Sequence, residues 1–162
     1  MKKRLIPIAM AAVMAVGSIP AAGALLDGFN NTSTYSDQFT DVPSTAWYYN
    51  SVKSAYELGI TAGTSASKFS PDQNLTTDQL TVFLARIHAA YHHNEIVEVQ
   101  NPSSWTDKYY YYVEQYIDSS YRDSIFGGRD NEQRWHFAYW ISKALPDSAY
   151  TAINNVPDGQ IL

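Results

Sequence analysis

The sequence repeats with a period of about 57 residues, and this repeat restricts the possible folds more than any other feature. Val42 and Val99 lie 57 positions apart, and Val156 lies 57 positions further on. Three further pairs share this offset: Phe69 with Phe126, Leu84 with Ile141, and Arg86 with Lys143. A repeat unit of this size cannot bury its own apolar face, so neighbouring units must pack together.

Each unit is predicted to contain a helix, a loop and a second helix, so the expected fold class is all-α with tandem helix–loop–helix repeats. In the first unit, an apolar stripe from Trp47 to Leu58 predicts a helix that Gly59 ends as a C-cap. Thr76 and Gln79 have the spacing of a capping box, and apolar residues follow them at helical spacing. The second unit repeats this pattern less regularly.

The units differ in how well they keep the pattern. We expect the first unit at residues 39–95 and a degenerate second unit at residues 96–152. Their first helices align at an offset of 61, with Val52 matching Val113, so the second unit lacks about four residues in its central loop. Residues 153–162 look like the start of a third unit that the chain does not complete.

The N-terminus has the three regions of a secretory signal peptide. Residues 1–4 are basic, residues 5–17 are apolar, and Ala22-Gly23-Ala24 offers a cleavage site. An uncleaved anchor is the alternative, but the many Ala and Gly residues and two prolines would make a poor membrane-spanning helix. We therefore expect residues 1–24 to be removed, with no membrane span afterwards. Residues 25–38 are expected to form a flexible lead-in.

The composition excludes several classes of protein. Three of the 11 basic residues lie in the expected signal peptide, which leaves 8 basic against 16 acidic residues in the exported form. This balance argues against a nucleic-acid partner. The absence of cysteine excludes a disulfide scaffold, a thiol nucleophile and a cysteine-based zinc site. The 13 tyrosines suggest contacts with sugars or with other protein surfaces.

Two short patterns resemble metal sites but lack essential ligands. His88 and His92 are four residues apart, yet no H-E-x-x-H motif and no third ligand accompany them, so a solvated helix end is expected. The run from Asp72 to Asp78 lacks the glycine and the glutamate of a calcium loop, so a capped turn is expected. No cofactor, metal or catalytic activity is predicted. A wall-modifying hydrolase is disfavoured because two-helix repeats seldom form the cleft that paired carboxylates need.

The ordered motifs of the first unit resemble the S-layer homology (SLH) repeat of bacterial surface proteins. The similarity runs from Phe39 to Tyr91 through F-x-D-V-P, W-Y-Y, G-I-x-x-G-T, F-S-P and a capped helix that ends in L-x-R. The resemblance implies a non-catalytic module that holds an exported protein to a secondary cell-wall polymer, often a pyruvylated and hence acidic glycan. It also implies units that work in threes around ligand grooves, at the cell wall or surface layer.

The resemblance also implies which residues bind the glycan. The T-R-A-E signature of the family opens the second helix, where Thr77 replaces the arginine in the first unit and Arg134 matches it in the second. Arginine suits an acidic ligand because its guanidinium binds a carboxylate through two hydrogen bonds, although a surface ion pair is the alternative role for Arg134. Trp135 is a candidate for stacking on sugar rings. Trp47 and Trp105 are further candidates, although a structural role as wedges between units is favoured for them.

Two functions remain open at this stage. The preferred one is non-covalent attachment to cell-wall glycan, and the alternative is a surface-layer assembly protein that binds other repeat proteins or itself. Two units and the start of a third cannot close a three-unit arrangement, so apolar surface near Phe137, Tyr139 and Trp140 should remain unmatched. The run from Tyr109 to Tyr112 must point to all sides of a helix, so some of its rings face the core and others a partner.

Overall fold

The computed structural model describes residues 28–125 and 132–149, and it does not describe the side chain of Arg134. The expected signal peptide at residues 1–24 and the expected start of a third unit at residues 153–162 lie outside the described residues.

The described residues form α-helices joined by loops, without any strand. The helices are α3 (Tyr49–Glu57), α4 (Thr77–His92), α5 (Asp107–Tyr116), α6 (Tyr121–Ser124) and α7 (Arg134–Ala144), followed by the short 3-10 helix η1 (Asp147–Ala149). The one β-type pairing in this part of the chain is an isolated bridge between Ser65 and Lys68. The all-α fold class is therefore confirmed.

The ends of the first-unit helices follow the sequence signals. The hydroxyl of Thr76 accepts a hydrogen bond from the N–H of Gln79 at 3.3 Å, and the side chain of Gln79 accepts one from the N–H of Thr76 at 2.9 Å. This is the predicted capping box, and it satisfies two N–H groups that have no partner within the helix. At the end of α3, Gly59 adopts a φ of 73°, which suits the predicted glycine C-cap.

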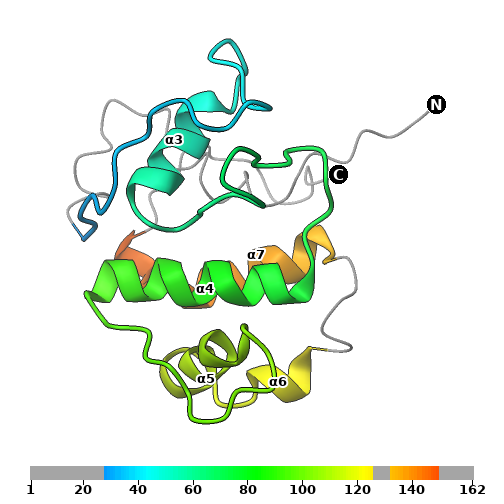
Figure 1. The fold of residues 1–162 in the computed structure, drawn as a ribbon. Helices are drawn as coiled ribbons and strands as arrows, with labels where there is room; N and C mark the ends of the chain where they lie inside the picture. Colours follow the sequence, from blue (N-terminus) through cyan, green and yellow to red (C-terminus); the bar gives the residue numbers. More distant parts are fainter. Residues whose placement is uncertain (1–27, 126–131, 150–162) are drawn as a thin grey trace, which may run out of the picture.

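Helix α4 lies at the centre of the molecule. Figure 1 shows α7 behind α4, with α5 and α6 below it and α3 above it. The helices α4 and α7 run parallel, and a 2.8 Å hydrogen bond from the N–H of Glu132 to the carbonyl of Leu75 joins the segments that precede them. One hydrophobic core contains buried side chains of both units, among them Leu80, Leu84, Val113 and Trp140. The two units therefore bury their apolar faces against each other, as the repeat predicts.

The aromatic residues of α5 and α7 divide between core and surface. In the tyrosine run, only Tyr111 is exposed, and the other three rings are buried. On α7, Phe137 and Trp140 are buried, with the ring of Trp140 4.6 Å from that of Tyr121 in an edge-to-face contact. The expectation of unmatched surface is therefore wrong for Phe137 and Trp140, because both face the shared core. It holds for Tyr139, which is exposed.

The segment before α3 packs against the first unit instead of forming the expected flexible lead-in. The N–H groups of Thr32 and Ser33 donate to the carbonyl of Glu57, which would otherwise lack a partner at the end of α3. Tyr35 is buried, and its ring makes edge-to-face contacts with those of Tyr49 and Tyr56. This segment, residues 28–39, is called the N-terminal strap below.

Candidate functional site

A groove of about 300 Å³ opens where the loops of the first unit meet the beginning of the second. The residues that line it come from three places: loop residues 60–64, 69–70 and 73–75, the α4 side chains Gln79, Val82, Phe83 and Arg86, and Trp105 just before α5. The groove thus depends on the packing of the two units, because no single unit supplies all of its walls.

Local geometry explains why the first-unit motifs form this wall. Gly63 has a φ of 78°, and a Cβ atom there would lie 2.5 Å from both the ring of Phe39 and the carbonyl oxygen of Lys68, so glycine is required. The carboxylate of Asp41 accepts hydrogen bonds from the N–H groups of Phe69 and Ser70 at 3.0 and 2.8 Å. Burial alone would raise the pKa of Asp41. The backbone hydrogen bonds outweigh this effect, so the pKa lies below its usual value. A charged Asp41 therefore holds the F-S-P turn in place.

The lining is rich in groups that bind hydroxyls. Thr61, Thr64 and Ser70 contribute hydroxyls, and the hydroxyls of Thr64 and Ser70 lie 2.7 Å apart. The amide side chains of Gln73 and Asn74 are on exposed residues at the same groove. Each of these groups can donate and accept hydrogen bonds, which is the requirement for binding a sugar.

Arg86 supplies the positive charge of the groove. Its guanidinium donates to the carbonyl of Ile60 at 3.4 Å and to the hydroxyl of Tyr109 at 3.2 Å, and it lies 5.5 Å from the centre of the Tyr109 ring. In the described part of the chain, no carboxylate lies within ion-pair distance of Arg86. A guanidinium has five N–H donors, so Arg86 keeps donors and an uncompensated charge for a ligand.

Arg86 was not predicted as a site residue from the sequence. It entered only as one of the pairs that define the repeat, opposite Lys143, and the candidate arginine was expected at the helix start. The one available signal was the L-x-R ending of the first-unit motif, but only folding brings this arginine beside the G-I-x-x-G-T loop.

The three candidate tryptophans all lie on the surface, but only one of them lines the groove. Trp105, Trp47 and Trp135 have exposed fractions of 67%, 61% and 67%. At these exposures, neither Trp47 nor Trp105 is enclosed between the two units, as the favoured role of a wedge between units would require. Trp105 lines the groove, with its ring 6.1 Å from that of Tyr109, whereas neither Trp47 nor Trp135 lines it.

Of the two positions of the family signature, Thr77 does not line the groove. Thr77 begins α4 and has an exposed fraction of 2%, so its side chain does not reach the surface as a glycan contact would. Its carbonyl accepts a hydrogen bond from the hydroxyl of Thr81 at 2.9 Å. Arg134 begins α7, and its side chain lies outside the described part of the structure.

The histidine pair on α4 forms part of the contact between the units. His88 is half-buried, and its Nδ1 shares a 3.0 Å hydrogen bond with the hydroxyl of Tyr112. Burial and, secondarily, the charge of His92 lower the pKa of His88 to about 4. The expectation of a solvated helix end is thus wrong for His88. Among residues 28–125 and 132–149, no group of three or more His, Cys, Asp or Glu side chains could hold a metal ion.

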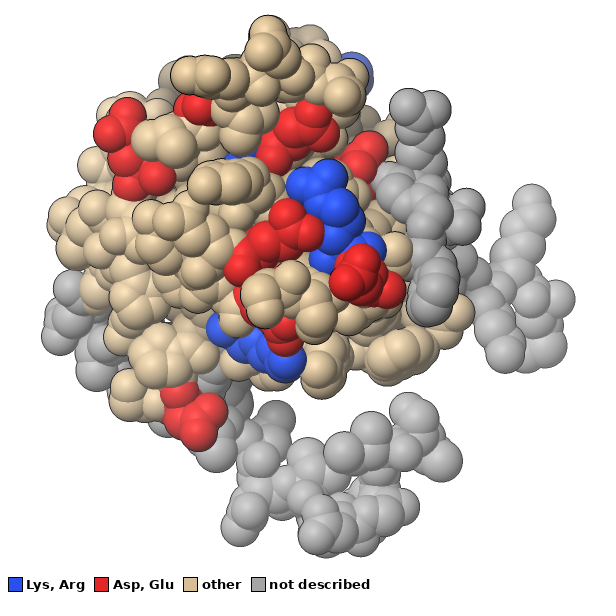
Figure 2. All heavy atoms as spheres, turned by 90° about the horizontal axis from the view of Figure 1, so that it is seen from below, with Lys and Arg blue, Asp and Glu red and all other residues tan. Residues whose placement is uncertain are grey.

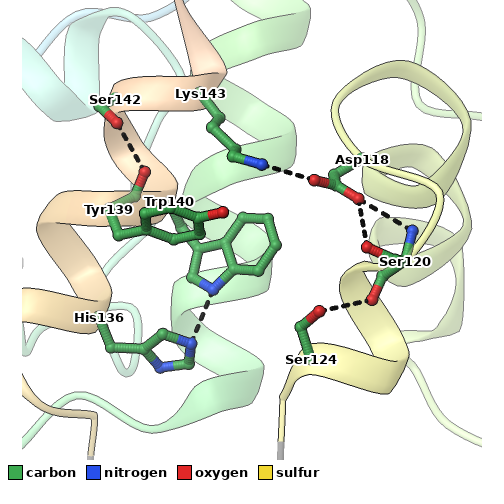
Figure 3. A network of polar contacts seen from close by, with 8 residues as sticks. All are labelled: Asp118, Ser120, Ser124, His136, Tyr139, Trp140, Ser142 and Lys143. Atoms are coloured by element: carbon green, nitrogen blue, oxygen red, sulfur yellow. Dashed lines mark hydrogen bonds and ion pairs between the residues drawn. The ribbon is translucent and has the colours of Figure 1, made fainter.

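Three other cations of the described residues, Lys108, Arg122 and Lys143, are paired with acids. On the face around α5 and α6, basic side chains lie directly beside acidic ones (Figure 2), and ion pairs join Lys108 to Glu98 and Arg122 to Glu114. Figure 3 shows Lys143 of α7 reaching Asp118, at 2.7 Å. The hydrogen bond from Lys143, helped by Ser120, lowers the pKa of Asp118 to about 2. This face therefore offers little net positive charge to an anion, unlike the position of Arg86.

Comparisons with known proteins agree with the first-unit motifs. Residues 38–79 match the family model of the S-layer homology domain, so the resemblance to the SLH repeat is confirmed for this part of the chain. A stretch of 68 residues is 37% identical to an endoglucanase of Bacillus sp. (strain KSM-635); it makes up 42% of this chain and 7% of that enzyme. The chain thus spans a small fraction of the enzyme's length. No solved structure matches the chain.

The domain match indicates a general class of function. An SLH domain is a non-catalytic module of the bacterial cell surface, and the match to its model at residues 38–79 supports a general role in surface anchoring. Most of the groove lining lies within this matched segment, and the remaining walls come from the middle of α4 and from Trp105. None of the helices in the described residues is long and apolar enough to cross a membrane.

Proposed function

We propose that this chain is exported and attaches non-covalently to an acidic glycan of the cell wall, through the groove between its two units. The observation that carries the proposal is the position of Arg86. This uncompensated cation lies in a groove lined by hydroxyl and amide groups, with an exposed indole at its edge. A carboxylate on the glycan would pair with the guanidinium, and a sugar ring would stack on Trp105.

The charge of the whole protein makes a local cation necessary. The chain carries 16 acidic and 11 basic residues, and an acidic protein repels an acidic polymer at long range. Binding must therefore rely on short-range contacts. Arg134 at the start of α7 is a second candidate contact, whereas the burial of Thr77 leads us to leave it out of the binding site.

A retention experiment on purified cell walls tests the proposal. The arginine should contribute about 1.5–3 kcal/mol as a charge-assisted pair, so Arg86→Gln should weaken retention by roughly tenfold to a hundredfold. Trp105→Ala should also weaken it without affecting stability, because the indole is exposed. Walls stripped of their secondary polymer should retain none of these proteins.

Arg122→Gln is the matched control, since it removes an arginine that is paired with Glu114 and lies outside the groove. Circular dichroism confirms that each variant is folded. If Arg86→Gln and Trp105→Ala are retained like the parent, the groove does not bind the glycan. Unchanged retention on stripped walls would favour the alternative function, an assembly protein that binds other repeat proteins.

A further inference from the structure

The helices α4 and α7 occupy equivalent places in the two units, but one equivalent face is buried on α4 and exposed on α7. At the offset of 57 residues, four positions of α4 correspond to four of α7: Asp78 to Trp135, Thr81 to Ala138, Val82 to Tyr139, and Ala85 to Ser142. On α4, the last three of these positions are buried, whereas all four positions on α7 are exposed. Trp135, Ala138, Tyr139 and Ser142 are called the α7 stripe below.

The stripe on α4 is covered by the unit that follows it. The hydroxyl of Tyr110 donates to Asp78 at 2.9 Å, and the hydroxyls of Tyr121 and Thr81 lie 2.9 Å apart. These contacts come from α5 and α6 of the second unit. On the α7 stripe, the ring and hydrogen-bond contacts of Trp135 and Tyr139 involve only neighbours within residues 133–143, so no described element takes the place of α5.

The other end of the repeat is already covered by the chain itself. Tyr49 of α3 corresponds to Tyr110 of α5 at the first-helix offset of 61. The hydroxyl of Tyr110 donates to Asp78 of the preceding unit, and that of Tyr49 donates to Asp37 of the N-terminal strap. The strap thus occupies the face of α3 that would otherwise meet a preceding unit. A second copy could not offer this face to the α7 stripe without releasing its strap.

We propose that the α7 stripe packs against the same stripe of a second copy of this chain, about a two-fold axis. Of the two ends of the described repeat, the stripe is the one that a copy can offer without losing a described contact. Ala138 and Ser142 are small and four residues apart, so two helices can approach to about 8–10 Å there. The rings of Trp135 and Tyr139 would pack around the point where the two α7 helices cross. The stripe contains no charged residue, and the nearby Lys143 is paired with Asp118.

A single pair of crossing helices buries less surface than a standard interface, so we expect a dissociation constant in the micromolar range. Sedimentation velocity tests this on the predicted exported form, Leu25–Leu162, between about 1 and 200 μM. This form contains every described contact. The parent should show a monomer–dimer equilibrium, and Tyr139→Glu should raise the dissociation constant at least tenfold. Tyr111→Glu is the matched control, because Tyr111 is 51% exposed and Tyr139 is 47% exposed, and it should dimerise like the parent.

A cross-link distinguishes the two-fold contact from a head-to-tail one. Because the chain has no cysteine, Ser142→Cys introduces a single thiol. Mild oxidation should convert this variant to a covalent dimer at least ten times faster than Tyr111→Cys. A monomer over the whole concentration range would overturn the proposal. Growth beyond the dimer, equal effects of both glutamate variants, or equal rates of cross-linking would also overturn it.

Discussion

Both halves of the chain build a pair of longer helices, but within the described residues the loop contacts of the motif are seen in the first unit. In the first unit, Asp41 anchors a turn, Gly63 permits a close approach, and Thr76 caps α4. In the second unit, Gln133 precedes α7 without a capping hydrogen bond from its side chain. Both units nevertheless contribute to one core. A buried apolar stripe thus holds the described part of the second unit in the shared core, whereas the walls of the groove also require the loop residues.

The largest expected effect tests how far the second unit supports the first. Trp140→Ala should lower the free energy of unfolding by about 3–5 kcal/mol, because the indole is fully buried and its N–H donates to His136 at 2.7 Å. Trp135→Ala, on the opposite side of α7, should change it by less than about 0.5 kcal/mol. Urea unfolding measures both values. Equal effects would show that the shared core does not extend through α7.

A second variant places the family's arginine in the unit that lacks it. Thr77→Arg should destabilise the protein by about 2–3 kcal/mol, because a long charged side chain must enter a buried position at the start of α4. Thr77→Ser is the control, and it should be nearly neutral. Thermal unfolding gives the comparison. A stable Thr77→Arg variant with stronger retention on cell walls would show that this helix start can bind the glycan.

The contact between the units should also depend on pH through His88. The unfolded pKa of about 6.5 exceeds the folded pKa of about 4, so the unfolded chain binds more protons between these values. Stability should therefore fall as the pH falls from 6.5 to 4, by about 1–2 kcal/mol after allowance for solvent screening. His88→Gln should reduce this dependence while it keeps a hydrogen-bonding group near Tyr112. A parent and a variant with the same pH dependence would exclude His88 as the cause.

The smallest effect compares the two helix starts directly. Thr76→Ala should cost about 1 kcal/mol, because it removes the hydrogen bond that caps α4. Gln133→Ala should cost less than about 0.5 kcal/mol, since the side chain makes no capping hydrogen bond on α7. Urea unfolding of both variants is the measurement. A larger cost at Gln133 would mean that the second unit keeps a cap of another kind.

Local signals predicted the helices well because they depend on neighbouring residues. The spacing of Thr76 and Gln79 and the position of Gly59 act within one helical turn. The groove could not be predicted in this way, since Arg86 meets Trp105 only after α4 and α5 have packed. The N-terminal strap was missed for a similar reason: its composition is polar, and the burial of Tyr35 depends on a distant helix. On α7, aromatic residues surround the whole helix, so the pattern could not tell the exposed Tyr139 from the buried Trp140.

The shared core has a consequence for how the folded chain responds to a protease. The connection between α4 and α5 is exposed at residues 92–95 and 100–105, so it is the natural place for a cut. Such a cut would break the covalent continuity of the chain but would remove none of the contacts between α4, α5 and α7. The two fragments should remain associated, and the groove that spans them should survive proteolysis.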